Sequence, residues 1–291
     1  MGVPDVSPPR PRRGRRLAVI GAGLLVLVLA VALGVRSLAG GDSAADRRNA
    51  LWVWHQVPPR ELLDVATAHQ VGRLLVWVAP GFSGDRASTG WLAELHRAAA
   101  ADGVALDALG GDPQWAVQPE LATQWASEAA ASGWFARLHL DVEPHALAQW
   151  RTASTTLLDG MVTALRNAAG AGLPVDADVP YWLGTVRTSA GVDGLSAVCR
   201  VAASITVMAY QDRASAIERV SAAAVSAAAR AGIPVWVGVN LREPAADEPS
   251  SSLWGQDRAT TTAVLAGVAA MPGVAGVALH DADALMALDG A

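Results

Sequence analysis

Residues 137–145 read RLHLDVEPH, an alternating run of apolar residues that ends in two carboxylates and a proline. A short run of this kind, bounded by turn residues, predicts a buried β-strand over residues 137–143. Seven similar runs occur along the chain, at residues 50–55, 73–79, 105–109, 174–179, 204–210, 234–241 and 273–280. The sequence therefore predicts eight strands.

Alanine-rich amphipathic segments separate these runs and predict helices over residues 61–70, 91–101, 121–131, 145–169, 195–201, 214–231, 258–270 and 282–288. Glycines 103, 133, 172 and 232 stand just before the next strand, where a left-handed residue ends a helix. Repeated strand–helix units imply parallel strands, and eight units within residues 49–291 predict an α/β fold, the (β/α)8 TIM barrel. A doubly wound open sheet is the alternative, but no Gly-x-Gly-x-x-Gly follows the first strand.

The first 36 residues have a different character. Five arginines within residues 10–16 precede residues 17–35, which carry no charge and are nearly long enough to cross a bilayer. This pattern predicts a cytoplasmic Arg/Pro-rich head at 1–16, a transmembrane signal anchor at 17–36, a linker at 37–48 and an extracytoplasmic barrel domain at 49–291. We therefore expect a single-pass protein of the cell membrane. A cleaved signal peptide is the alternative, because Ser37, Leu38 and Ala39 resemble a processing site.

Composition narrows the classes of partner. All 22 basic residues are arginines, and beyond residue 36 the chain has 16 arginines against 26 acidic residues, a net charge of about −10. Nucleic acids and anionic membrane surfaces are therefore not expected partners. The single cysteine, Cys199, excludes an intrachain disulfide and a cysteine-based zinc site. We expect a monomer.

The end of the 137–143 strand carries the strongest functional signal. Alternation places His139, Asp141 and Glu143 on one face, and the apolar residues between them on the other. The apolar face should meet the helices, so the polar face points into the barrel, whose C-terminal end is where such folds place their active sites. Two carboxyl groups close together and partly buried raise the pKa of at least one of them, which suits a general acid. The alternative is a pair of structural carboxylates held by arginine or backbone donors.

Other predicted strand ends add aromatic and polar residues. The chain has 11 tryptophans but only 2 tyrosines and 2 phenylalanines. Tryptophan faces near strand ends can stack on sugar rings, and together with the carboxylates they favour a carbohydrate cleft. The candidate substrate-binding residues are Trp54, Trp77, Asp178, Gln211, Trp236, Asn240 and His280.

Two of these strands resemble those of a known family. Asp141-Val-Glu143 and Met208-Ala-Tyr210 are similar to strands four and six of family 18 glycoside hydrolases, the chitinase-like barrels, whose patterns are D-x-x-D-x-D-x-E and M-x-Y-D. The resemblance implies that Glu143 protonates the glycosidic oxygen and that Asp141 orients the substrate's N-acetyl group, which attacks the anomeric carbon. It also implies that Tyr210 hydrogen-bonds that group, that the substrate is a polysaccharide or other glycan, and that no cofactor is needed.

The resemblance has departures. Ala136 and His139 occupy the two earlier Asp positions, Gln211 follows the tyrosine with Asp212 one place later, and His280 stands near the family's strand-eight tryptophan. A second resemblance uses the same glutamate. Val142-Glu143-Pro144 is similar to the N-E-P motif of a clan of retaining glycosidases, whose nucleophile ends strand seven, where this chain has Asn240 and then Glu243.

Two further classes stay open. One is a non-catalytic cell-envelope barrel that binds carbohydrate or acts as a scaffold. The other is a metal-dependent hydrolase, although the histidines are scattered and we expect no metal site. Its candidate ligands are His55, Asp112, Asp141, Glu143, His280 and Asp281. The long loop at 242–253 is either a lid over the cleft or disordered.

Overall fold

The computed structural model describes residues 49–290. The predicted cytoplasmic head, transmembrane anchor and linker, residues 1–48, lie outside the described residues. Within the described part of the chain, none of the helices combines the length and the apolar character needed to cross a bilayer.

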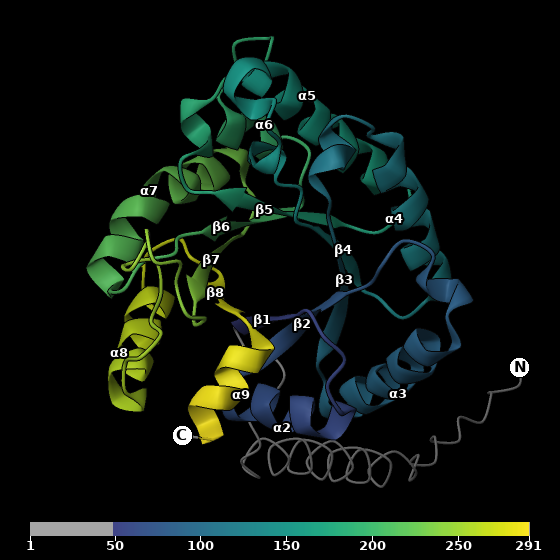
Figure 1. The fold of residues 1–291 in the computed structure, drawn as a ribbon, viewed down its shortest axis with the longest axis vertical. Helices are drawn as coiled ribbons and strands as arrows, with labels where there is room; N and C mark the ends of the chain where they lie inside the picture. The colour runs from purple at the N-terminus through teal and green to yellow at the C-terminus, as the bar shows by residue number, and fades with distance from the viewer. Residues whose placement is uncertain (1–48, 291) are drawn as a thin grey trace, which may run out of the picture. The chain divides into compact units, whose positions relative to one another are not determined.

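Eight parallel strands close into a barrel in sequence order, with β1 paired to both β2 and β8 (Figure 1). The strands are β1 Asn49–Val53, β2 Val71–Trp77, β3 Ala105–Gly110, β4 Arg137–Leu140, β5 Val175–Pro180, β6 Ser204–Met208, β7 Val235–Asn240 and β8 Gly276–His280. The predicted (β/α)8 barrel is confirmed, and the alternative of an open doubly wound sheet is wrong.

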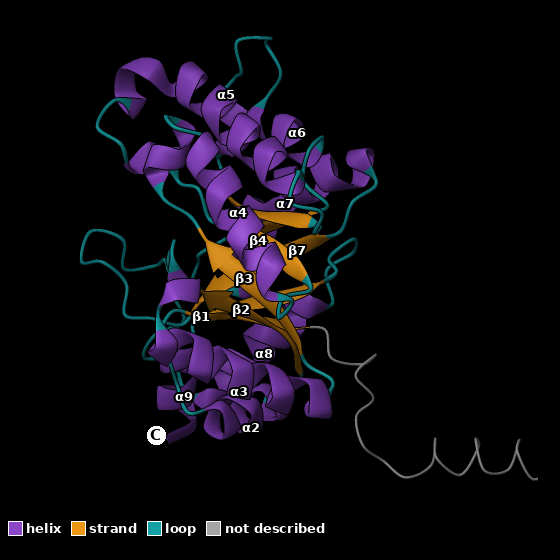
Figure 2. Ribbon diagram, turned by 90° about the vertical axis from the view of Figure 1, so that its right-hand side faces the viewer, coloured by secondary structure: helices purple, strands orange, loops and turns teal. Residues whose placement is uncertain are grey.

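Helices surround the strands on the outside (Figure 2). They are α2 Pro59–Ala68, α3 Arg86–Asp102, α4 Glu120–Ser132, α5 Trp150–Ala169, α6 Gly194–Cys199, α7 Ala214–Ala231, α8 Arg258–Ala269 and α9 Ala282–Gly290. Short 3₁₀ turns follow four strands, namely η2 Phe82–Gly84, η3 Pro113–Ala116, η4 Pro144–Ala146 and η5 Leu183–Thr185. Gly103, Gly133 and Gly232 end α3, α4 and α7 with φ between 69° and 71°, as predicted.

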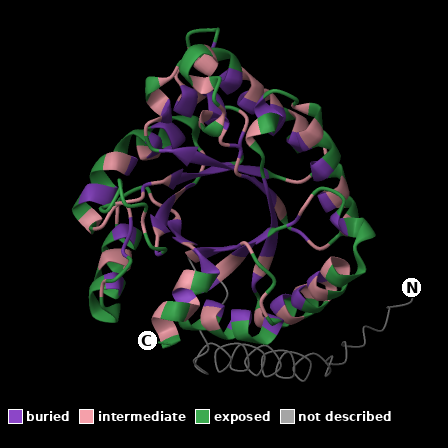
Figure 3. Cartoon of the chain, viewed as in Figure 1, coloured by how far each residue is buried: buried purple, intermediate pink, exposed green. Residues whose placement is uncertain are grey.

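The core has two layers, and the strands themselves are largely buried (Figure 3). The outer layer lies between strands and helices and includes Leu138, Leu140 and Val142. The inner layer fills the barrel with Ala50, Trp52, Leu75, Leu109 and Ala278. The inward and outward alternation predicted for residues 138–142 is therefore confirmed.

Charged side chains occupy the N-terminal half of the barrel. The Arg73 guanidinium donates to Asp107 at 2.7 Å and also to Asp176, and Arg137 Nε donates to Asp176 at 2.8 Å. Asp107 and Asp176 are almost fully buried, so these arginines supply the partners that buried carboxylates require.

Several strands are shorter than predicted, and two of these differences affect the site. β4 ends at Leu140 and β6 at Met208, whereas the sequence predicted strands to 143 and 210. The Asp141 N–H still donates to the Gly110 carbonyl at 2.9 Å, after which Pro144, which has no N–H, begins η4.

The helix predicted over 145–169 is also shorter and starts at Trp150. Residues 141, 143 and 210 therefore stand on segments that leave the strand ends, at the mouth of the barrel.

Candidate active site

Asp141 and Glu143 follow β4 at the C-terminal mouth of the barrel. Val142, between them, is buried in the outer core, so the two carboxyl groups lie on the inner side. A Cβ on Gly111 would lie 2.0 Å from the Asp141 carbonyl oxygen. A glycine at 111 is therefore required for the close approach of the two chain segments that positions Asp141.

A buried ion pair lies beneath these carboxyl groups. Asp178 of β5 contacts His139 of β4, with 2.8 Å between Oδ1 and Nε2, and it accepts a hydrogen bond from Trp52 Nε1 at 3.2 Å. Burial lowers the pKa of His139, but the Asp178 carboxylate more than offsets this and raises it, which favours a protonated imidazole beside Asp178. Asp178 was predicted to bind substrate, but it is 1% exposed and both its oxygens are engaged, so it supports the site from below.

Asp141 has a carboxyl oxygen without a partner. Its Oδ1 is shielded from solvent and accepts no hydrogen bond. Burial, followed by the nearby Asp178 and Glu143 carboxylates, raises the pKa of Asp141 well above its usual range. This carboxyl group can therefore hold a proton at pH values where an ordinary aspartate is ionised.

Glu143 lies in the wall of an open cleft of about 580 Å³. Burial and then the Asp178 carboxylate raise the pKa of Glu143, while its side chain stays 36% exposed. His145 Nε2 lies 3.6 Å from Glu143 Oε1, and burial lowers the pKa of His145, so its imidazole is neutral at neutral pH. A carboxyl group that is accessible, and that a raised pKa keeps protonated to higher pH, is suited to donate a proton to a bound molecule.

Tyr210 lines the same cleft as Glu143. Burial, with further contributions from Asp178 and other carboxylates, raises the pKa of Tyr210 well above its usual range, so its hydroxyl stays neutral. The Gln211 side chain also lines the cleft and donates to the Tyr210 carbonyl at 2.7 Å. The structure thus brings Asp141, Glu143, Tyr210 and Gln211 together.

His280 lies beside this group at the end of β8. Its Nε2 accepts a hydrogen bond from Trp54 Nε1 at 3.2 Å, and its ring centroid lies 5.6 Å from that of Tyr210. Burial lowers the pKa of His280, which is consistent with a neutral ring that accepts at Nε2. A polar ring therefore occupies the position near which the family resemblance would place a tryptophan.

Asn240 supports the β7 loop. Its Nδ2 donates to the Ser251 carbonyl at 3.2 Å, and its Oδ1 accepts from the Arg242 N–H at 3.0 Å. These bonds hold the loop at 242–253, which brings Asp247 and Glu248 to the cleft. Asn240 was predicted to bind substrate; in the structure its side chain bonds to this loop, and its Oδ1 also lies 3.4 Å from His280 Nδ1.

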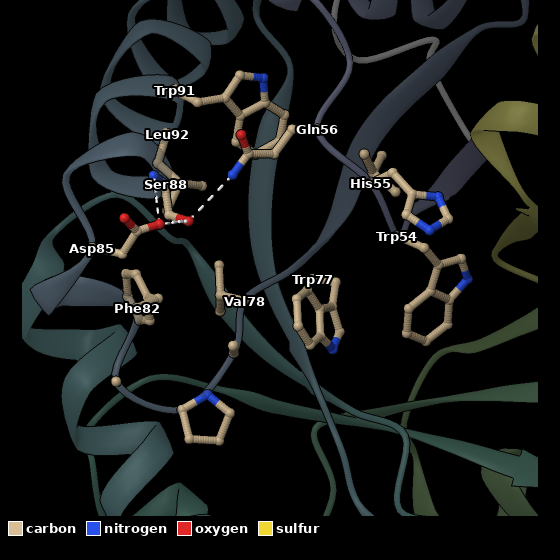
Figure 4. Close-up of a pocket in the computed structure, with 14 residues that line it drawn as sticks. Trp54, His55, Gln56, Trp77, Val78, Phe82, Asp85, Ser88, Trp91 and Leu92 are labelled. Atoms are coloured by element: carbon tan, nitrogen blue, oxygen red, sulfur yellow. Dashed lines mark hydrogen bonds between the residues drawn. The ribbon is translucent and has the colours of Figure 1, made fainter.

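Trp236 was predicted to bind substrate, but it does not line the cleft. It is the second residue of β7, whereas the cleft lies beyond the last, and its ring lies 5.1 Å from the Arg73 guanidinium. Alternation correctly predicted that Trp236 faces into the barrel. It lies near the N-terminal end of β7, however, and the cleft is at the C-terminal end. Trp54 and Trp77, by contrast, line a second cavity of about 380 Å³ at the mouth (Figure 4).

The structure does not bring together the second carboxylate pair or the candidate metal ligands that the sequence suggested. Glu243, the nucleophile candidate of the second resemblance, is exposed and does not line the cleft. Of the candidate metal ligands, His55 pairs with Asp283 at 2.8 Å, and Asp281 pairs with Arg242 at 3.0 Å. Across residues 49–290, no three His, Cys, Asp or Glu side chains are grouped to hold a metal ion.

Two aromatic side chains of the cleft wall, His145 and Trp182, were not among the predicted substrate-binding residues, although Trp182 was one of the tryptophans near strand ends that favoured a carbohydrate cleft. His145 and Trp182 have ring centroids 5.1 Å apart, and Trp150 lies 6.0 Å from Trp182. Both residues lie near predicted strand ends, because His145 ends the RLHLDVEPH stretch and Trp182 follows β5. Their contact with each other is visible only in the folded structure. Asp247 and Glu248 were visible only as acids in a long loop.

Replacing Asp141 by asparagine is expected to stabilise the protein at neutral pH. A carboxyl group whose pKa is raised in the folded state costs stability as the pH rises from about 3.9 through the raised value, and asparagine removes that cost. A gain of about 1 kcal/mol would raise the melting temperature by roughly 2–4 °C. Thermal unfolding at pH 7 measures it, with Asp247→Asn, an exposed carboxylate at the same cleft, as control. An unchanged or lower melting temperature for Asp141→Asn would contradict the expectation.

Comparisons with known proteins support the fold. No family model matches the chain, and no curated protein matches it by sequence. A chitinase from Chromobacterium violaceum superposes with a TM-score of 0.51 at 14% identity, over 84% of this chain and 98% of that one. The spore cortex-lytic enzyme SleL of Bacillus cereus gives 0.53 at 12% identity, over 83% of this chain and 74% of that one. At these identities the likeness shows a shared barrel fold.

Proposed function

We propose that this protein hydrolyses a glycan that contains N-acetylhexosamine, with Glu143 as the general acid. The observation that carries the proposal is the grouping of Glu143, Asp141 and Tyr210 at the mouth of the barrel. All three have a raised pKa, and burial is the main cause in each. Both the similar barrel fold of the chitinase and the motif resemblance support this assignment.

In the proposed reaction Glu143 donates its proton to the glycosidic oxygen as the bond to the anomeric carbon breaks. The acetamide oxygen of the same sugar forms the new bond, while Asp141 holds the acetamide N–H and the Tyr210 hydroxyl donates to its oxygen. Water then attacks the anomeric carbon as the bond from that carbon to the acetamide oxygen breaks, and it gives its proton to the Glu143 carboxylate, which restores the acid. The protein supplies proton transfer and orientation, and the substrate supplies the nucleophile.

This chain departs from the family pattern beneath the carboxyl groups. His139 stands where the family has an aspartate, but Asp178 of the neighbouring strand contacts His139 and is an electrostatic neighbour of both Asp141 and Glu143. A negative charge near Asp141 is therefore present, supplied by β5 instead of β4. We propose that this exchange preserves the function of the carboxyl pair.

The direct test is incubation of the purified full-length protein with the β-1,4-linked hexamer of N-acetylglucosamine, with release of shorter oligomers followed by mass spectrometry. Release that depends on Glu143 supports the proposal. Absence of release would contradict it.

A second candidate is a barrel that binds glycans without cleaving them. His280 in place of a tryptophan, and the loss of the two earlier aspartates at Ala136 and His139, favour this function. Binding of the hexamer without release would select it.

We further propose that an N-terminal helix anchors the protein in the cell membrane and that the barrel domain is extracytoplasmic. The uncharged run at 17–35 behind five arginines supports this proposal. Protease added to intact cells should digest the barrel while an epitope tag before residue 1 stays protected. A barrel that is digested only after lysis would contradict the orientation, and recovery of the protein without membranes would contradict the anchor.

A further inference from the structure

His145 stands beside the proposed acid, two residues beyond the last position of the family pattern. It belongs to the turn η4, in which the Ala146 N–H donates to the Glu143 carbonyl at 3.0 Å. Pro144 lies between the two residues and has a restricted φ, so the turn presents both side chains in a set arrangement. The Glu143 and His145 side chains both line the cleft of about 580 Å³.

Two tryptophans hold the His145 ring in place. The Trp182 ring centroid, after β5, lies 5.1 Å from that of His145, with an interplanar angle of 82°. The Trp150 ring centroid, at the start of α5, lies 6.3 Å from it, with an angle of 71°. Edge-to-face contacts with two indoles restrict rotation of the imidazole. The His145 ring is therefore held firmly, whereas the Glu143 side chain, which is 36% exposed, has room to move toward it.

The two side chains are close to hydrogen-bond distance. His145 Nε2 lies 3.6 Å from Glu143 Oε1, which is longer than the roughly 3.2 Å limit of an N–H···O bond. A small rotation of the Glu143 side chain closes this gap. That movement gains little while the carboxyl group is protonated. It gains more once the group is a carboxylate, because a hydrogen bond to an ionised acceptor is about twice as strong as one to a neutral acceptor.

The charge state of His145 suits a hydrogen-bond donor. Burial lowers the pKa of His145, so its ring is neutral at neutral pH and carries one N–H. The elements packed against the ring, α5 and the segment after β5, contact it through Trp150 and Trp182, which carry no charge. The other titratable groups that line the cleft are Glu143, Tyr181, Tyr210, Asp247 and Glu248. No arginine is among the described residues that line the cleft, so none competes there with His145 for the Glu143 carboxylate.

We propose that His145 is a positioning residue for the acid, and that its Nε2–H donates to the Glu143 carboxylate that forms when the proton passes to the glycosidic oxygen. The bond strengthens as negative charge develops on Glu143, so it stabilises the transition state more than the ground state. His145 keeps its own proton throughout, and the bond weakens again when water returns a proton to Glu143. The inference rests on the proposed function and adds a residue to it.

Two substitutions of His145 separate the hydrogen bond from the packing. Phenylalanine keeps an aromatic ring beside the two tryptophans but has no N–H, whereas glutamine keeps an N–H donor and loses the ring. With the hexamer of N-acetylglucosamine, His145→Phe should lower kcat by roughly ten- to a hundredfold and leave KM within a few-fold of the parent. His145→Gln should retain kcat to within a few-fold.

His96→Phe is the matched control. His96 is also a half-buried histidine beside a tryptophan, with its Nδ1 3.1 Å from the Trp134 carbonyl, but it belongs to α3 and lines a different cavity. This substitution should change neither kcat nor KM.

The ionisation of Glu143 gives a second measurement that does not depend on cleavage. A donor to a carboxylate lowers its pKa, so His145→Phe should raise the pKa of Glu143 further, and His145→Gln should leave it near the parent value. NMR titration of the full-length protein, labelled with ¹³C at the glutamate carboxyl carbons, measures this pKa. The Glu143 resonance is identified by its absence from Glu143→Gln. The alkaline limb of the rate profile should move to higher pH in His145→Phe alone.

Three outcomes would overturn the inference even if the parent protein cleaves the hexamer. They are an equal kcat for the parent and His145→Phe, a lower kcat for His145→Gln than for His145→Phe, and an unchanged Glu143 pKa in His145→Phe. A pKa that rises in His145→Phe and not in His145→Gln, in a protein that does not cleave the hexamer, would support the hydrogen bond to the carboxylate and reject the proposed function.

Discussion

Replacing Glu143 by glutamine should lower the rate of glycan hydrolysis by about 10²–10⁴-fold and leave glycan affinity within a few-fold of the parent. Glutamine keeps the size of the side chain and its place in the cleft but has no acidic proton to transfer. The affected quantity is therefore kcat, and calorimetry with the hexamer of N-acetylglucosamine checks that the cleft is intact.

The pH dependence should agree with this role. Burial and the Asp178 carboxylate raise the pKa of Glu143, and only the protonated form can act as the acid. Activity should therefore persist above the usual glutamate range and fall as the pH rises through the raised value. This falling limb should be absent from any residual activity of Glu143→Gln.

Glu243→Gln is the matched control. Glu243 is exposed outside the cleft, and it is the nucleophile candidate of the retaining alternative. Its replacement should leave the rate unchanged if the substrate acetamide is the nucleophile. Retained turnover in Glu143→Gln would remove Glu143 from its role, and loss of turnover in Glu243→Gln would favour the retaining mechanism.

The second large effect concerns stability. Replacing His139 by leucine should lower the free energy of unfolding by about 3–5 kcal/mol, because it leaves the Asp178 carboxylate buried without its cationic partner. For a domain of this size that loss corresponds to roughly 10 °C in melting temperature. Denaturant unfolding of the purified protein measures the change.

Two controls make this expectation specific. The double variant His139→Leu with Asp178→Asn removes the stranded charge but keeps an acceptor for Trp52, so it should recover part of the loss. His55→Leu breaks a pair of the same 2.8 Å length with Asp283, but these side chains are 67% and 49% exposed, so the loss should stay below about 1 kcal/mol. Equal losses at His139 and His55, or a double variant less stable than His139→Leu, would contradict the account.

The pair should also make stability depend on pH. Asp178 raises the pKa of His139 in the folded protein. Its contribution is therefore fully present below the unfolded histidine value of about 6.5 and is lost as the pH rises through the raised value. The penalty of His139→Leu should shrink at alkaline pH.

The barrel was predictable because its signals are local. Period-two alternation in runs such as 137–143, and glycines such as Gly103 at helix ends, depend on neighbouring residues and survive in any context that buries one face. Asp141 and Glu143 could be assigned to the inner side for the same reason, since alternation continues past the last paired residue. Counting such units was sufficient to identify the architecture.

The composition of the site depends on contacts between distant residues. Asp178 and Trp236 both face inward, as alternation predicted, yet one is held by His139 and Trp52 below the cleft and the other packs on Arg73 at the far end of the barrel. The position of a side chain along the barrel axis depends on strand register and on its partners on other strands. The alternating pattern of a single strand does not encode either. The periodic pattern of the chain thus specified the barrel and the face of each side chain, and long-range packing specified which of those side chains line the cleft.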